Sequence, residues 1–230
     1  MTAIREEVLS SVWMGLEPFA SPADPSRVDI QGWSSDNPYL TAAIDEVRPQ
    51  IVIEIGAWKG ASVITMAERI RELGLNGVVI AIDTWLGSWD HWLQNEWFSH
   101  LQFENGYPTL YRTFAANIAH TGLTQHVVPL PLDATSAANV LKSRGIRPEV
   151  LHIDGGNDFA TVLNDLEHWW PILRPGGTLI GDDYHTSGEA WPGVRDAFHR
   201  FFHTDHIENA GGKCIVRKPN LKHGAVRRFV

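Results

Sequence analysis

The sequence predicts an α/β protein built on a Rossmann-like, doubly wound and mainly parallel sheet of seven strands. From Gln50 onward, short apolar runs alternate with amphipathic segments of ten or more residues. The apolar runs show little internal alternation of apolar and polar residues, which is typical of strands buried on both faces of a parallel sheet. The last two runs follow one another with no helix between them, which predicts a C-terminal antiparallel hairpin.

The expected elements follow one another within a single domain. Strands are expected at residues 51–56, 77–83, 126–132, 149–154, 176–183, 205–210 and 213–218. Helices are expected at residues 60–74, 110–123, 136–145, 159–174 and 191–202. Residues 1–48 are expected to form a helix and a segment draped over the main domain. That domain spans residues 49–218 with an aromatic insertion at 85–108, and residues 219–230 form a basic tail.

Composition and charge argue against several classes of partner. The chain has 19 basic and 27 acidic residues and a formal net charge of −8, which argues against a nucleic acid partner. No apolar stretch approaches the roughly 20 residues that span a bilayer, and the N-terminus lacks the apolar core of a secretory leader. The single cysteine, Cys214, excludes an internal disulfide and suits a reducing compartment. We therefore expect a cytoplasmic protein without a membrane partner.

Acidic residues stand at or beside the ends of the predicted strands. They are Glu54, Asp83, Asp133, Asp154, Asp182 and Asp183. Right-handed crossovers bring the carboxyl ends of parallel strands to one edge of the sheet, where ligands bind. Carboxylates gathered at such an edge lose solvation and repel one another. Their arrangement therefore indicates a functional site.

The stretch "EIGAWKGAS" places Gly56 and Gly60 between a strand and a helix, which is typical of a nucleotide-type ligand at a helix N-terminus. A dinucleotide motif needs glycine where Trp58 stands, which argues against NAD and FAD. A ligand without phosphates, such as S-adenosylmethionine, has no such need, and Glu54 can hold its cationic amino group. The alternative is a plain turn whose glycines allow tight packing.

Two further acids fit the same ligand. Asp83 ends the second strand, where an acid accepts hydrogen bonds from ribose hydroxyls, although a helix cap or a solvated acid is equally open. Asp133 ends the third strand, where its side chain can reach an adenine amino group. The sequence "DATS" also reads as a cap for the next helix. Glu54, Asp83 and Asp133 stand at or near the ends of three successive strands, and together they indicate this ligand more strongly than any one of them does alone.

The series "EIGAWKGAS", "AIDTW", "LDATS", "HIDGGNDFATVLNDLEHWWPILRPGG" and "LIGDDY" resembles the class I S-adenosylmethionine-dependent methyltransferases. It resembles most closely the bacterial branch with magnesium-dependent sugar O-methyltransferases of macrolide and aminocoumarin pathways. The resemblance covers roughly Ile51 to Phe202. It implies S-adenosylmethionine as cofactor, with candidate binding residues Glu54, Gly56, Ala57, Trp58, Gly60, Ser62, Asp83, Thr84, Trp85, Asp133, Ala134 and Asp154.

The resemblance also implies a Mg²⁺ site at Asp154, Asp182 and Asp183. Three converging carboxylates repel one another unless they are protonated or neutralised, and a hard divalent ion suits them. The alternative is that Asp154 binds only the cofactor amine while Asp182 or Asp183 caps the next segment.

One position departs from the family pattern and leaves the catalytic base open. Gly156 stands where sugar methyltransferases often have an acid assigned as the base, and Asn157 follows it. We expect His185, directly after "DDY", to act as the base together with the catalytic Asp154, and Asp158 is the second candidate. The alternatives are that His185 is an ordinary loop histidine and that the proton of a metal-bound hydroxyl leaves to solvent.

Four of the ten tryptophans fall in "WLGSWDHWLQNEW", directly after Asp83. Their faces suit sugar rings, planar acceptors or the sulfonium cation, unless they bury a lid or a dimer contact. The segment "VDIQGWSSDNPYL" would complete such a cap. We expect an O-methyltransferase acting on a hydroxyl of a small polyhydroxylated molecule, as in natural product biosynthesis. A metal-independent or N-directed methyltransferase, a non-catalytic cofactor-binding module and a homo-oligomer stay open.

Overall fold

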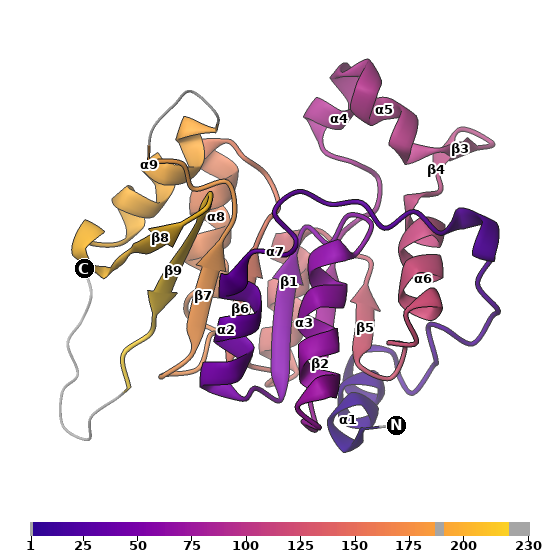
Figure 1. Ribbon diagram of the computed structural model, residues 1–230, viewed down its shortest axis with the longest axis horizontal. Coiled ribbons are helices and arrows are strands. Elements are labelled where there is room, and N and C mark those ends of the chain that lie inside the picture. The colour runs from indigo at the N-terminus through magenta and orange to yellow at the C-terminus, as the bar shows by residue number, and fades with distance from the viewer. Residues whose placement is uncertain (1, 187–190, 221–230) are drawn as a thin grey trace.

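The computed structural model describes residues 2–186 and 191–220 and contains the predicted seven-stranded sheet (Figure 1). In spatial order the strands are β5 (Val127–Leu130), β2 (Val78–Ile82), β1 (Ile51–Ile55), β6 (Val150–Ile153), β7 (Thr178–Gly181), β9 (Lys213–Arg217) and β8 (Glu208–Ala210). The first five are parallel, whereas β9 runs antiparallel to both β7 and β8. The predicted fold class is therefore confirmed, including the C-terminal antiparallel hairpin.

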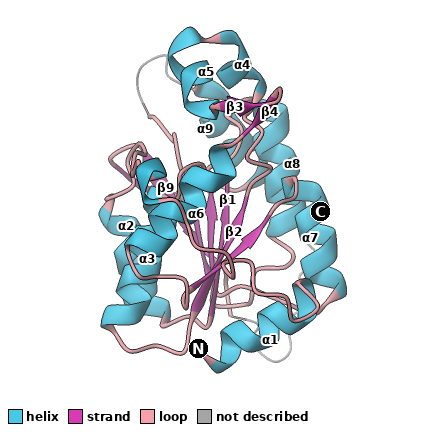
Figure 2. Cartoon of the chain, turned by 90° about the vertical axis from the view of Figure 1, so that its right-hand side faces the viewer, coloured by secondary structure: helices cyan, strands magenta, loops and turns pink. Residues whose placement is uncertain are grey.

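Helices cover both faces of the sheet, as Figure 2 shows. On one face lie α1 (Ala3–Val12), α7 (Ala134–Ser143), α8 (Phe159–Trp169) and α9 (Pro192–Phe201). On the other face lie α2 (Pro38–Val47), α3 (Ala61–Glu72) and α6 (Leu110–His120). Alternate strand residues enter the two cores: Ile53 packs with the first set of helices and Val52 with the second.

Helix α2 is the helix on the sheet that the sequence did not predict, because its start lies in a stretch that reads as a turn. Asn37 caps it by accepting a hydrogen bond from the Tyr39 backbone N–H at 3.0 Å, and Pro38 occupies the first helical position. Both residues are typical of turns and also of helix N-termini. The apolar stripe of Leu40, Ala43 and Ile44 is buried against the sheet, so tertiary packing decides in favour of a helix.

Residues 85–108 form two short helices and a small hairpin above the carboxyl edge of the sheet (Figure 1). They are α4 (Trp89–Leu93), α5 (Asn95–Leu101), β3 (Phe103–Glu104) and β4 (Tyr107–Pro108). The N-terminal segment, with the 3₁₀ turn Pro25–Arg27, crosses the front of the same edge. These two segments therefore cover the edge where the acidic residues end their strands.

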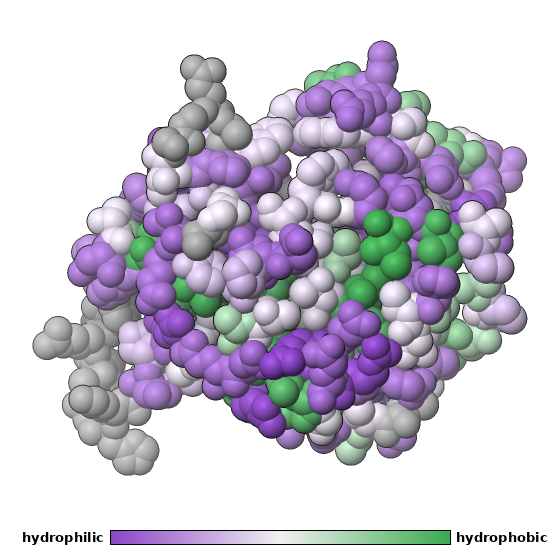
Figure 3. Space-filling view, in the orientation of Figure 1, coloured by the Kyte–Doolittle hydropathy of each residue, from purple (hydrophilic) through white to green (hydrophobic). Residues whose placement is uncertain are grey.

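The surface gives little sign of an extended apolar interface on the face drawn in Figure 3, where apolar side chains form separate small patches among hydrophilic ones. Among the described residues, none of the helices is long and apolar enough to cross a membrane. Of the predicted basic tail, residues 221–230 lie outside the described residues.

Candidate functional site

Two adjoining cavities open at the carboxyl edge of the parallel strands, with volumes of ≈640 and ≈340 Å³. The larger one reaches Asp83 and Asp133, and the smaller one reaches Trp33, Asp182 and Asp183. They share the residues Gly56, Trp58, Ser88, Asp90, His91, Asp154, Gly155, Asn157 and Trp191. The two cavities can each hold one ligand, and the shared residues form a common wall between them.

Gly56 lies where the carboxyl ends of β1 and β6 come closest. Its φ is +86°, and a Cβ atom there would lie 1.9 Å from the Asp154 carbonyl oxygen. The backbone hydrogen bonds between β1 and β6 continue past the ends of the strands, since the Asp154 N–H donates to the Ile55 carbonyl at 2.9 Å. Only glycine fits this position, which brings the backbone of the turn directly against the cavity.

The turn after Gly56 is held by Asp83. One carboxylate oxygen of Asp83 accepts from the Trp58 backbone N–H at 2.8 Å, and the other accepts from the Trp85 N–H at 2.7 Å. The Trp85 indole N–H donates to the Trp58 carbonyl at 2.8 Å. These bonds fix Trp58 at a φ of +47°, a conformation that costs a bulky residue free energy. Each oxygen of Asp83 retains a lone pair, so Asp83 can hold the turn and still face a ligand.

The other predicted cofactor residues divide into two groups. Thr84, Asp133 and Ala134 line the larger cavity, and Ala57 and Ser62 line the smaller one. Asp133 also caps α7 by accepting from the Ser136 N–H at 2.8 Å, so the alternative role given by "DATS" is present as well.

Glu54, Gly60 and Trp85 line neither cavity. Glu54 is fully buried beneath the site and accepts a hydrogen bond from the Ser62 hydroxyl. Gly60 is the N-cap of α3 with a φ of +88°, and a Cβ atom there would lie 2.9 Å from the Phe114 ring. Trp85 is buried against Tyr111 and Phe114. These three residues support the turn from behind.

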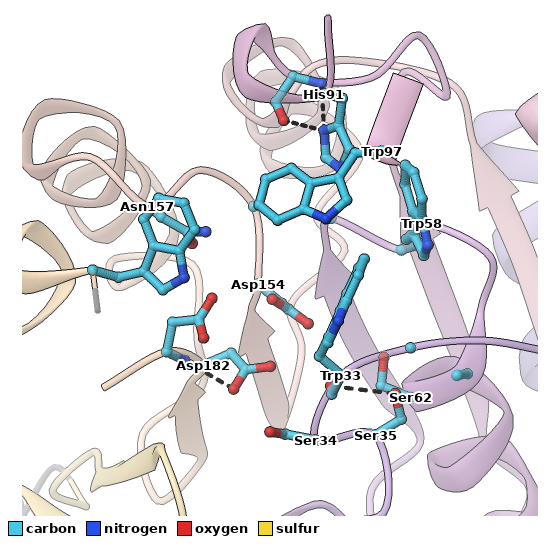
Figure 4. A pocket seen from close by; sticks show the side chains of 18 of the residues that line it. Trp33, Ser34, Ser35, Trp58, Ser62, His91, Trp97, Asp154, Asn157 and Asp182 are labelled. Carbon is cyan, nitrogen blue, oxygen red and sulfur yellow. Dashed lines mark hydrogen bonds between the residues drawn. The ribbon is translucent and has the colours of Figure 1, made fainter. Parts of the chain in front are cut away.

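Asp154, Asp182 and Asp183 all line the smaller cavity, and Figure 4 labels the first two. Burial, followed by the neighbouring Asp182 carboxylate, raises the pKa of Asp154 well above its usual range. Asp183 has a φ of +52°, which aspartate tolerates, and its N–H donates to Asp182 Oδ1 at 2.8 Å. The three acids predicted to bind a metal therefore face one cavity, and Asp154 is buried there beside a second carboxylate.

A protein-family model for a methyltransferase domain matches residues 53–184, which is more than half of the chain. The chain belongs to this methyltransferase family. The match confirms the class that the motifs predicted, and it includes the turn at Gly56 and the carboxylates at Asp154, Asp182 and Asp183.

Individual proteins are also similar to this chain. The uncharacterized protein y4gI of Sinorhizobium fredii is 23% identical over 151 residues, or 66% of this chain and 15% of y4gI. This chain thus spans a small part of that curated relative. The O-methyltransferase TomG of Streptomyces achromogenes, solved with S-adenosylmethionine, matches 95% of this chain and 90% of its own at 14% identity and a TM-score of 0.56. CalS11, a TDP-rhamnose 3'-O-methyltransferase of calicheamicin biosynthesis, matches 80% and 79% at 19% identity and a TM-score of 0.56.

Beneath the carboxylates of this methyltransferase domain lies a buried polar row that the sequence analysis missed. Lys213 of β9 is fully buried, and its ammonium pairs with Asp182 Oδ2 and lies 3.2 Å from His152 Nε2. His152 Nδ1 lies 3.4 Å from Glu54 Oε1, without hydrogen-bond geometry. Polar residues inside the apolar runs "IVIEI", "VLHI" and "KCIV" were the available signal, because alternation places them on one face of the sheet.

The residues present fit a hard divalent cation. Three carboxylates face the smaller cavity, and Asp154 forms no ion pair with any described residue. Oxygen donors of this kind suit Mg²⁺. Within the described chain, however, the side chains whose ligand atoms all lie within 4.8 Å of one another are Glu54, His152 and Asp154. The predicted set of Asp154, Asp182 and Asp183 does not meet this distance, and Asp182 pairs with Lys213.

The two candidate bases lie apart from the cavities or have another role. His185 lines neither cavity, and its Nε2 lies 3.6 Å from Asp183 Oδ1. Asp158 lines the larger cavity but caps α8, accepting from the N–H groups of Ala160 and Thr161 at 3.1 and 3.0 Å. The sequence left open that His185 is an ordinary loop histidine, but it gave no sign that Asp158 caps a helix.

His91, which the sequence analysis did not single out, lines both cavities. The Ser88 N–H donates to its Nδ1 at 3.1 Å, so the proton of the neutral ring is on Nε2. Burial lowers the pKa of His91, which keeps the ring neutral. Its ring stacks on Trp58 with centroids 4.5 Å apart. A neutral histidine in this tautomer offers a hydrogen-bond donor to a ligand.

Indole rings form a continuous aromatic wall along the smaller cavity. Trp33 lies 6.1 Å from both Trp58 and Trp97, and Trp97 lies 6.4 Å from Trp191, as distances between ring centroids. In Figure 4 the labelled indoles stand above and to the right of the Asp154 carboxylate. The cavity therefore has an aromatic wall and an acidic floor.

Lys59 ties the two covering segments to the turn at the site. It is fully buried, and its ammonium pairs with Asp29 of the N-terminal segment and lies 2.8 Å from His100 Nδ1 of α5. Gln31 adds a second tie by accepting from the Trp58 indole N–H at 3.0 Å. The N-terminal segment and the insertion thus close over the smaller cavity together.

Asp165 of α8 gives a first testable prediction. It lines the larger cavity and is 2% exposed, and burial raises its pKa from 3.8 to about 7. Because the pKa is higher in the folded state, ionisation of Asp165 costs stability as the pH rises from about 4 to about 7. We expect Asp165→Asn to raise the free energy of unfolding at pH 8 by on the order of 2–4 kcal/mol, and to change it little at pH 4. Urea denaturation at both pH values measures this, and an equal effect at both would contradict it.

Proposed function

We propose that this protein transfers the methyl group of S-adenosylmethionine to a hydroxyl oxygen of a small polyhydroxylated acceptor, with Mg²⁺ at the carboxylates. The observation that carries the proposal is the position of Asp154. Its carboxylate lies in the wall that the two cavities share, beside Asp182 and Asp183 in the smaller one. A donor and an acceptor placed in the two cavities would meet at this wall.

The larger cavity suits the donor. S-adenosylmethionine supplies an activated methyl group, so the protein has to align the donor and the acceptor and exclude water. Asp83 and Asp133 suit hydrogen bonds to ribose and adenine, and Gly56 lets the donor approach the backbone. The presence of S-adenosylmethionine in TomG supports this assignment, because the two proteins share the fold.

The carboxylates suit Mg²⁺. Asp154 and Asp183 would hold the ion, with Asp182 shared between it and Lys213. A bound divalent cation lowers the pKa of a hydroxyl that it contacts. The neutral His91, which also lines both cavities, would donate a hydrogen bond from Nε2 to a ligand. No histidine lining the cavities in the described chain has a free basic nitrogen, so the proton of the hydroxyl passes to a carboxylate or to solvent.

The smaller cavity suits a ring with one apolar face and several hydroxyls. The aromatic wall packs against the apolar face, and the acidic floor accepts hydrogen bonds from the hydroxyls. No lysine or arginine is among the described residues that line either cavity, so no cationic side chain there can pair with a phosphorylated acceptor. CalS11 acts on a sugar attached to a nucleotide, and this chain suits an uncharged sugar ring or a catechol.

Calorimetry with S-adenosylmethionine, with Mg²⁺ and with EDTA tests the proposal. We expect micromolar binding of S-adenosylmethionine and a separate Mg²⁺ isotherm that Asp183→Asn abolishes. Asparagine tolerates the left-handed backbone at position 183, so this variant removes charge with little strain. Loss of Mg²⁺ binding together with unchanged cofactor binding supports the metal-dependent reaction. Absence of cofactor binding in the parent would reject methyl transfer altogether.

A metal-independent or N-directed methyl transfer is the second candidate, and the contact between Lys213 and Asp182 favours it. That contact already supplies one positive charge to the carboxylates. This candidate predicts cofactor binding without any Mg²⁺ isotherm and turnover that EDTA leaves unchanged. Screening sugars, catechols and amines with labelled S-adenosylmethionine then separates O-directed from N-directed transfer.

Trp33→Ala tests the aromatic wall. Trp33 is half exposed and contacts both Trp58 and Trp97, so its removal opens one side of the smaller cavity. We expect the KM for a sugar or catechol acceptor to rise roughly tenfold or more, because a large apolar contact is lost. The affinity for S-adenosylmethionine should change less than twofold. Trp92→Ala, on the insertion but outside both cavities, is the control, and equal effects of the two variants would contradict the assignment.

A further inference from the structure

We propose that Lys213 is a resident counter-ion of the carboxylate site and competes with a divalent cation for Asp182. This inference rests on the proposed function, since it concerns the same carboxylates. Lys213 has no exposed surface, and its ammonium contacts Asp182 Oδ2 and His152 Nε2. It is a positioning residue, because it reaches the site only through Asp182.

The register of the sheet fixes this contact. Gly181 of β7 pairs with Cys214 of β9 in antiparallel register. One step further, Asp182 leaves β7 opposite Lys213, and the Asp182 N–H remains bonded to the Ile153 carbonyl at 2.9 Å. Both partners are thus held by the backbone hydrogen bonds of the sheet. The pair does not depend on the flexible reach of a surface lysine.

The charge of the site explains what the ammonium does. Asp154, Asp182 and Asp183 carry three negative charges when ionised, and Lys213 is the single lysine or arginine that forms an ion pair with any of them in the described chain. The remaining charge of minus two matches one divalent cation. The ammonium of Lys213 therefore reduces the repulsion among the carboxylates of the metal-free site, and the same positive charge repels an incoming cation.

Two linked effects follow for a variant without this charge. A divalent cation would no longer compete with an ammonium for Asp182, so it should bind more tightly. The metal-free protein would retain Asp182 as a buried carboxylate without a partner, so it should be less stable. Because a ligand that binds only the folded state stabilises it, added Mg²⁺ should restore the melting temperature of the variant more than it raises that of the parent.

Lys213→Met and Lys213→Gln test this inference without an acceptor. Methionine fills a similar volume without charge, and glutamine retains a hydrogen-bond donor to Asp182. Lys59→Met is the matched control, because Lys59 is equally buried and paired with an aspartate, but that aspartate, Asp29, lines neither cavity. The measurements are the Kd for Mg²⁺ by calorimetry and the melting temperature in EDTA and in saturating Mg²⁺.

We expect the Kd for Mg²⁺ to fall at least tenfold in Lys213→Gln and in Lys213→Met, and to change less than twofold in Lys59→Met. The melting temperature in EDTA should fall in both Lys213 variants and recover in Mg²⁺. An unchanged or weaker Kd in a folded Lys213 variant overturns the inference, because Lys213 would then only orient Asp182. If neither the parent nor the folded variants bind Mg²⁺, the metal part of the proposed function fails as well. If the parent binds and the variants bind equally, only the inference fails.

Discussion

Replacing Asp154 with asparagine is expected to lower both the Mg²⁺ affinity and the rate of methyl transfer by roughly a hundredfold or more. Asp154 is the carboxylate in the wall that the two cavities share, and it has no ion-pair partner among the described residues. The substitution replaces this carboxylate with a neutral amide at the place where donor and acceptor would meet. Calorimetry with Mg²⁺, followed by initial rates with labelled S-adenosylmethionine, measures both effects.

The same substitution should raise the stability of the metal-free protein, although it lowers metal affinity and rate. The pKa of Asp154 is raised in the folded state, so its ionised form costs stability as the pH rises above the unfolded value of 3.8. Asparagine avoids this cost. We therefore expect Asp154→Asn to melt at a higher temperature than the parent in EDTA at pH 8, and to lose this advantage near pH 4. A variant that is inactive and also less stable in EDTA would indicate that Asp154 is structural.

The sheet was predictable because its signals are local. Each parallel strand is a short apolar run, and the helices that connect these strands turn an apolar stripe to the sheet. The failure at α2 has a local cause as well. Asn37 and Pro38 serve a turn and a helix start equally well, and only burial of Leu40 and Ile44 decides between them.

The gathering of acidic residues at the carboxyl edge of the sheet was predictable from topology, but the role of each side chain was not. Asp83 and Asp133 were each open to a capping or structural role, whereas Asp158 was a candidate base. All three accept backbone hydrogen bonds here. A side chain at a strand end meets both the next turn and the ligand cavity, so one residue can serve both. Sequence position does not apportion the two roles, because they depend on which N–H groups the turn directs at the carboxylate.

The buried row of Lys213, His152 and Glu54 shows why the electrostatics of the site could not be predicted. Glu54 and His152 are direct neighbours in the register of β1 and β6, whereas Lys213 stands far along the chain from both. Its meeting with Asp182 depends on the antiparallel register of β9 against β7. A single lysine in an apolar run gives no indication of which strand it will face. His91 escaped notice for a similar reason, since its tautomer depends on a hydrogen bond within an irregular insertion.

Gly56→Ala should have the largest effect on the fold and on the donor site together. The new Cβ atom would lie 1.9 Å from the Asp154 carbonyl oxygen, at a backbone φ of +86° that alanine rarely adopts. The strands β1 and β6 would have to move apart at the point where both cavities meet. We expect the free energy of unfolding to fall by roughly 3 kcal/mol or more, and S-adenosylmethionine binding to weaken by at least tenfold in the protein that still folds.

Gly74→Ala separates steric conflict from backbone strain. Gly74 has a φ of +62°, but a Cβ atom at this position would meet no other atom within 4 Å, and Gly74 follows α3 at the far end from the cavities. Alanine there should cost only the roughly 1–2 kcal/mol of a left-handed backbone and leave cofactor binding unchanged. Urea denaturation and calorimetry with S-adenosylmethionine compare the two variants. Equal losses of stability would mean that β1 and β6 can part without cost, and the close approach at Gly56 would then be incidental to the donor site.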